Sequence, residues 1–134
     1  MGEYFESGKW NHIAEAPVGK DFYDYAVLYA AGDFYYFGGN ADNNFRSILC
    51  LNSTTWTWST IGHLNKAREG HGVILIEQTF MIIGGEGNYT TEACLLKNGN
   101  FTCEETDSTL TNYYRTPLLF PVNDKYTDNC TDPA

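Results

Sequence analysis

Two short stretches, FYYFGGN at residues 34–40 and FMIIGGE at residues 80–86, share an aromatic or apolar run that ends in a glycine pair, 46 residues apart. Glycine pairs after such runs suit a crowded strand end, where a side chain would clash and unusual backbone angles are useful. A repeat of this length built from strands is typical of a β-propeller blade. The two stretches therefore predict an all-β repeat protein.

Short apolar and β-branched runs surround both stretches and are separated by Gly, Asn, Asp and Pro. Convincing helical periodicity is absent, so these runs are expected to be strands. The first set is expected at residues 25–30, 34–37, 47–51 and 56–60, and the second at 72–76, 80–83, 91–96 and 100–104. Short turns within each set predict two four-stranded antiparallel meanders.

The composition limits the classes of partner. The chain of 134 residues is 16% aromatic and carries a formal net charge of −9. Nucleic-acid binding needs clustered Lys and Arg, and the eight present here are scattered. No run of 18 apolar residues occurs, so neither a nucleic-acid nor a membrane role is expected.

The segment TWTWSTIGHLNKAREGHGVILIEQTFMIIGG, residues 55–85, closely resembles the kelch repeat. The family pattern is a Trp, apolar residues three and six positions later, an Arg-x-Gly-His, an apolar strand and a Gly-Gly. Its places are filled here by Trp58, Ile61, Leu64, Arg68, Gly70, His71, Gly84 and Gly85, and the first repeat carries its own glycine pair at Gly38 and Gly39. The resemblance implies kelch-type β-propeller blades.

The pattern becomes fainter toward both ends of the chain. Trp10 and Ile13 resemble the closing strand of a preceding blade, and residues 117–122 (PLLFPV) resemble the first strand of a following one. The expected division is 1–22 for the closing strand and connector, 23–62 for the first blade, 63–108 for the second, and 109–134 for the next strand and tail. Because propellers close with four to eight blades, we expect an incomplete propeller or one part of an assembly.

The cysteines predict a disulfide in the second repeat. Asn98-Gly99 is a strong hairpin-turn sequence, and counting outward from it places Cys94 opposite Cys103. Reduced thiols and a Cys103–Cys130 pairing are the alternatives. Cys50 and Cys130 would pair with each other or with residues outside the chain, and no zinc-ligand spacing accompanies them.

Four N-glycosylation sequons begin at Asn52, Asn88, Asn100 and Asn129, each at an expected turn or loop. Together with the predicted disulfide they indicate an extracellular or secretory-pathway protein. Chance sequons in a cytosolic protein are the alternative.

No catalytic or cofactor motif is present in the sequence. The kelch pattern explains His71 and places Arg68 beside an inner strand, where a buried ion pair or backbone hydrogen bonds are the expected role. The histidines His12 and His63 hold equivalent places in successive repeats, which indicates packing rather than metal binding. Acidic residues of the tail, from Asp124 to Asp132, lack the density of a calcium loop, so no metal site is expected.

The expected function is therefore a non-catalytic extracellular kelch propeller segment that binds or scaffolds a protein or glycan. Further blades of the same chain, or self-association through open strand edges, would complete the sheet stack. Three alternatives stay open: a fragment of a copper-radical oxidase resembling galactose oxidase, a self-associating structural matrix protein, and an intracellular kelch adaptor. None of them is carried by a motif in this chain, and no cofactor is expected.

Overall fold

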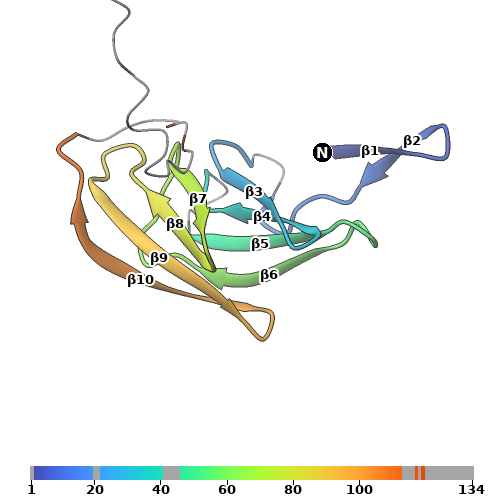
Figure 1. The fold of residues 1–134 in the computed structure, drawn as a ribbon. Coiled ribbons are helices and arrows are strands. Elements are labelled where there is room, and N and C mark those ends of the chain that lie inside the picture. Colours follow the sequence, from blue (N-terminus) through green and yellow to red (C-terminus); the bar gives the residue numbers. More distant parts are fainter. Residues whose placement is uncertain (1, 20–21, 41–45, 113–116, 118, 120–134) are drawn as a thin grey trace, which may run out of the picture.

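The computed structural model describes residues 2–19, 22–40, 46–112, 117 and 119, and within them every regular element is a β-strand (Figure 1). The strands are β1 Gly2–Glu6, β2 Lys9–Ile13, β3 Ala26–Ala30, β4 Asp33–Phe37, β5 Ser47–Asn52, β6 Trp58–His63, β7 Gly72–Ile76, β8 Thr79–Ile83, β9 Thr90–Lys97 and β10 Asn100–Thr109. No helix of the described residues is long and apolar enough to cross a membrane.

The strands form two four-stranded antiparallel meanders and one hairpin. We call β3–β6 the first sheet and β7–β10 the second sheet. Strand order follows chain order in both, as the sequence predicts, and the expected boundaries of most strands are correct to within two residues. Figure 1 shows the two sheets lying against each other, with the β1–β2 hairpin projecting to one side. The described strands do not close into a ring.

The main core lies between the two sheets. Tyr35, Phe37 and Ile48 of the first sheet pack against Phe80 and Phe101 of the second. The ring centroids of Phe80 and Phe101 lie 4.9 Å apart with the rings nearly perpendicular, the edge-to-face arrangement that aromatic quadrupoles favour. Alternation along each strand therefore buries one face of each sheet in a shared aromatic core.

The glycine pairs are explained by close backbone approach. Gly39 and Gly85 have φ of +92° and +110°, a region that residues with a side chain rarely adopt. A Cβ on Gly39 would lie 2.8 Å from the carbonyl oxygen of Tyr23, and one on Gly85 would lie 2.9 Å from that of Glu69. Each glycine pair thus lets the connector before a sheet pack directly on the end of that sheet's second strand.

Two expectations about strand bounds need correction, and a third expectation stays a prediction. Trp10 and Ile13 do lie in a strand, β2, which pairs with the unpredicted β1 among the described strands; that β2 closes a preceding blade stays a prediction. Strand β6 begins at Trp58, because Trp56 sits in a turn with φ of +54°. Strand β10 continues to Thr109, well past the expected end at residue 104. The expected strand at 117–122 lies outside the described residues except for 117 and 119.

Candidate functional site

The two repeats have matching hydrogen bonds between the connector before each sheet and the loop after its glycine pair, so residues of one repeat can be aligned with residues of the other. Asn40 donates its backbone N–H to Tyr23 O at 2.8 Å, and Glu86 donates to Glu69 O at 3.0 Å, so the two connectors meet the glycine-pair loops in the same way. Tyr23 of the first repeat therefore corresponds to Glu69 of the second. On this alignment Phe22 corresponds to Arg68, and Tyr25 corresponds to His71.

Arg68 forms a buried, fully paired ionic cluster in the second repeat. Its side chain is fully buried, and its Nε donates to Glu92 Oε1 at 3.0 Å. Nη1 donates to the carbonyl oxygens of Gly84 at 2.8 Å and Thr90 at 2.7 Å, while Nη2 donates to Thr90 Oγ1 at 2.7 Å. The predicted structural role of Arg68 fits this geometry, because the hydrogen bonds of its guanidinium group hold the loop before β9 in place.

Glu92 balances this charge and fixes the connector on its other side. Its Oε2 accepts the backbone N–H of Asn65 at 2.7 Å, and its Oε1 accepts that of Lys66 at 3.1 Å. Glu92 is fully buried in β9. A buried charge is tolerated when it is paired and its remaining lone pairs are hydrogen-bonded, as they are here.

His71 lies beside this cluster with 4% of its surface exposed. Burial, and secondly the positive charge of Arg68, lower the pKa of His71 from 6.5 to about 4. Neither imidazole nitrogen makes a hydrogen bond of normal geometry with a described residue, although a contact with the Phe37 backbone partly opposes these two effects on the pKa. A neutral imidazole filling space is the state that this environment favours.

The first repeat replaces the ionic cluster with apolar and aromatic side chains. The pairing registers place Leu49 opposite Tyr36 and Glu92 opposite Ile82, so Leu49 holds the position of Glu92. Both members of the ion pair are therefore exchanged together, for Phe22 and Leu49. A joint exchange is physically consistent, since changing one member alone would leave a buried charge without a partner.

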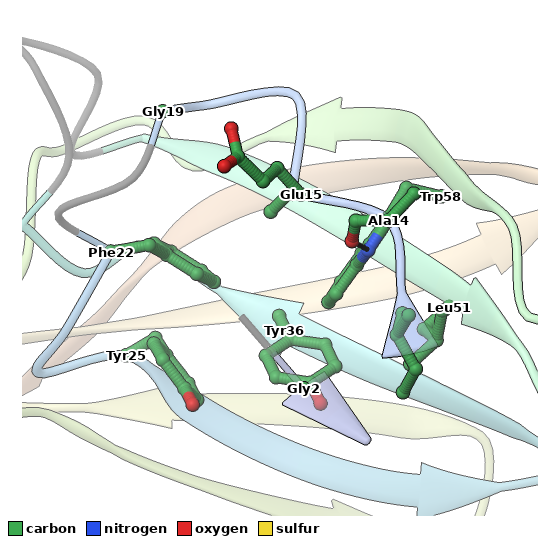
Figure 2. A pocket seen from close by; sticks show the side chains of 11 residues that line it. Gly2, Ala14, Glu15, Gly19, Phe22, Tyr25, Tyr36, Leu51 and Trp58 are labelled. Atoms are coloured by element: carbon green, nitrogen blue, oxygen red, sulfur yellow. Dashed lines mark hydrogen bonds between the residues drawn. The ribbon is translucent and has the colours of Figure 1, made fainter. Parts of the chain in front are cut away.

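These aromatic replacements line a pocket of about 320 Å³, which we call the aromatic pocket. Its walls come from the β1–β2 hairpin, the connector after it, and the face of the first sheet turned away from the second sheet. Figure 2 shows the rings of Phe22, Tyr25, Tyr36 and Trp58 arranged around it. Sequence reasoning did not find this site; aligning the two glycine pairs would have revealed Phe22 and Tyr25 at the positions of Arg68 and His71.

The rings of the pocket present faces in several directions. Phe22 and Tyr25 are stacked with centroids 4.3 Å apart. Tyr36 is tilted by 58° to Tyr25 at 5.0 Å, and Trp58 by 62° to Tyr36 at 4.9 Å. The indole Nε1 of Trp58 donates to Ala14 O at 2.8 Å, which fixes the ring against the connector.

The described lining of the pocket carries few charged side chains. Among the described residues that line it, Glu15 is the one charged side chain, and no Lys or Arg is present. Burial, with a smaller contribution from Tyr25, raises the pKa of Tyr36, so its hydroxyl stays protonated at neutral pH. The pocket therefore offers π-faces and two phenol groups.

The Cys94–Cys103 disulfide is confirmed. The two residues lie opposite each other in the β9–β10 pair, with Cα atoms 4.1 Å apart. The same register in the first sheet holds Leu51 and Trp58, so the disulfide stands where that sheet has its Trp anchor. Cys50 is half-buried and forms no disulfide among the described residues, and Cys130 lies outside them.

One group of potential metal ligands is brought together in the described part of the chain: Glu92, Cys94 and Cys103. Two of these are joined in the disulfide and the third bonds to Arg68, so the group holds the fold together. The other candidate residues are not brought together here. His12 is exposed and contacts Glu3 at 3.2 Å, while His63 is exposed at the end of β6. The acidic tail lies outside the described residues.

The sequons differ in their surroundings. Asn100 is exposed at the tip of the β9–β10 hairpin. Asn52 uses its Oδ1 to accept the backbone N–H groups of Thr54 and Thr55, at 3.0 and 2.9 Å. Asn88 accepts from the Thr90 hydroxyl at 2.8 Å, which joins its sequon to the Arg68 cluster. Asn129 lies outside the described residues.

Comparison with known proteins gives no further assignment. No family model matches the chain, and no curated protein matches it significantly.

Proposed function

We propose that this chain is a non-catalytic extracellular binding module built from kelch-type blades, and that the aromatic pocket is its ligand site. The observation that carries the proposal is the difference between the two repeats at equivalent positions. In the second repeat Arg68 and His71 are buried. In the first repeat Phe22 and Tyr25 stand at the equivalent positions and line a pocket. A concave, largely aromatic cavity with a few polar groups has the character of a ligand site.

The extracellular part of the proposal is supported by the disulfide and by sequon position. Disulfides persist in oxidising compartments and are rare in the cytosol. The exposed hairpin tip carrying Asn100 gives a glycan room to project into water. Both observations favour a secreted module over the intracellular adaptor.

The scaffold part of the proposal is supported by apolar side chains on the face of the second sheet that is turned away from the first sheet. Ile76 and Leu95 lie on this face and are 50% and 37% exposed. Blades bury such faces by stacking on neighbours. A further blade, of this chain or of another, is the partner that this face fits.

A ligand screen followed by thermal unfolding tests the proposal. A ligand that binds only the folded protein raises the unfolding temperature by mass action. We expect at least one extracellular glycan, peptide or small molecule to raise it in the wild type and in Tyr89→Leu, an exposed control outside the pocket, but not in Tyr25→Leu. Chemical conversion of the ligand, detected by mass spectrometry, would contradict a non-catalytic role. A shift that survives Tyr25→Leu would remove the pocket as the site.

A further inference from the structure

The aromatic pocket combines features that select a particular ligand chemistry. Four aromatic side chains line it, and their ring planes stand at several angles to one another, as Figure 2 shows. The negative faces of such rings attract a cation placed over them, and a quaternary ammonium group is the usual ligand of a cage of this kind. On this basis we propose that the pocket binds a small organic cation through its trimethylammonium group.

The charge of the surroundings supports a cation over an anion. The chain as a whole has a net charge of −9, and neither Lys nor Arg is among the described residues that line the pocket. A phosphate or carboxylate group would meet this field with no Lys or Arg of the described lining to neutralise it. Choline should therefore bind more tightly than phosphocholine, whose phosphate lies close to its ammonium group.

The pocket lining has too few side-chain hydrogen-bonding groups to favour a sugar as the ligand. The Trp58 indole already donates to Ala14 O, which leaves the hydroxyls of Tyr25 and Tyr36 as the side-chain hydrogen-bonding groups considered for the described lining. A sugar presents many hydroxyls, and each one left unpaired in the pocket would weaken binding. A trimethylammonium group has no N–H donor and requires no such partner.

The size of the pocket is compatible with this ligand. A volume of about 320 Å³ is at the small end of the range for ligand pockets. This volume is large enough for a choline-sized molecule. The inference rests on the proposed function as a binding module and names its ligand class.

The test compares choline with 3,3-dimethylbutan-1-ol, which has the same shape but a carbon atom in place of the ammonium nitrogen. Each is titrated into the intact chain, and binding is followed by tryptophan fluorescence, because Trp58 lines the pocket. We expect a saturable response to choline and an affinity about tenfold lower for the neutral alcohol, the effect of a cation over aromatic faces. Equal affinity for the two compounds, or no saturable response to choline, would overturn the proposal.

Two variants and two further ligands sharpen the test. Tyr25→Leu keeps apolar bulk but removes one π-face, so choline binding should fall severalfold while Tyr89→Leu leaves it unchanged. Should Tyr25→Leu fail to fold, Phe22→Leu removes another π-face of the pocket and should likewise weaken choline binding severalfold. Phosphocholine or a methyl glycoside binding more tightly than choline would reject the ligand class. If a ligand of another class stabilises the wild type but not Tyr25→Leu, the proposed function as a binding module is supported and the proposed ligand class is rejected.

Discussion

Exchanging the buried Arg68–Glu92 pair for the Phe22–Leu49 pair found at the same positions of the first sheet should reveal strong energetic coupling. The single change Glu92→Leu leaves the guanidinium of Arg68 buried without its counter-charge and removes the acceptor of two backbone N–H groups. Breaking a buried ion pair in this way costs about 3–5 kcal/mol of unfolding free energy. Arg68→Phe alone should cost a similar amount, because the carboxylate is then buried and unpaired.

The double variant Arg68→Phe/Glu92→Leu contains no uncompensated charge. It should therefore be more stable than the sum of the single effects predicts, with a coupling free energy of about 2 kcal/mol or more. Full recovery is not expected, since Gly84 O and Thr90 O lose the hydrogen bonds that Nη1 donates. Buried pairs differ in this respect from surface pairs, whose contribution is small.

Urea unfolding of the wild type, both single variants and the double variant measures this coupling. The matched control is the surface pair Lys66–Glu105, whose atoms lie 3.1 Å apart with both side chains about 40% exposed. Truncating it should give a coupling below about 1 kcal/mol. Additive effects of Arg68→Phe and Glu92→Leu, within about 0.5 kcal/mol, would refute the view that the two residues act as one buried unit.

Other features of the second repeat give further predictions. Replacing Cys94 and Cys103 by Ala should cost about 2–3 kcal/mol, because the bridge closes a short loop, and reducing agent should lower the melting temperature of the wild type but not of this variant. The pKa of His71 is about 4 in the folded protein and near 6.5 when unfolded, so the unfolded chain takes up the proton first as pH falls. Lowering the pH from 7 to 5 should cost about 2 kcal/mol that His71→Gln does not lose, and equal pH dependence of both proteins in urea unfolding would contradict this. Gly85→Ala should cost more than Gly32→Ala in the same assay, because both glycines have positive φ but a Cβ at Gly32 meets nothing within 4 Å.

The β9–β10 hairpin and the two four-stranded sheets could be predicted because they follow from turn residues and from the alternation of apolar residues within short segments. The Asn98-Gly99 turn fixes the register that places Cys94 opposite Cys103, and alternation with turn residues places the other strands. Strand β1 escaped prediction because its five residues include few apolar ones. Its turn is nevertheless visible as Ser7-Gly8, both with positive φ.

The pocket could not be predicted from local patterns, because its residues meet only in the folded chain. Phe22 and Trp58 lie far apart in sequence, and neither belongs to a motif that specifies a ligand. Glu92 was missed as the partner of Arg68 for a similar reason, since a carboxylate within an apolar strand carries no sign of its contacts. The informative signal was the departure of the first repeat from the kelch pattern ahead of Tyr25.

The intact mass of the natively produced protein, measured before and after glycosidase treatment and with and without reduction, tests the central claim of an extracellular module most directly. The account predicts sugar on at least one of Asn52, Asn88 or Asn100. It also predicts that Cys94 and Cys103 gain two hydrogen atoms on reduction, because they are joined in the native protein. A chain that carries no sugar and is fully reduced as isolated would contradict the extracellular assignment.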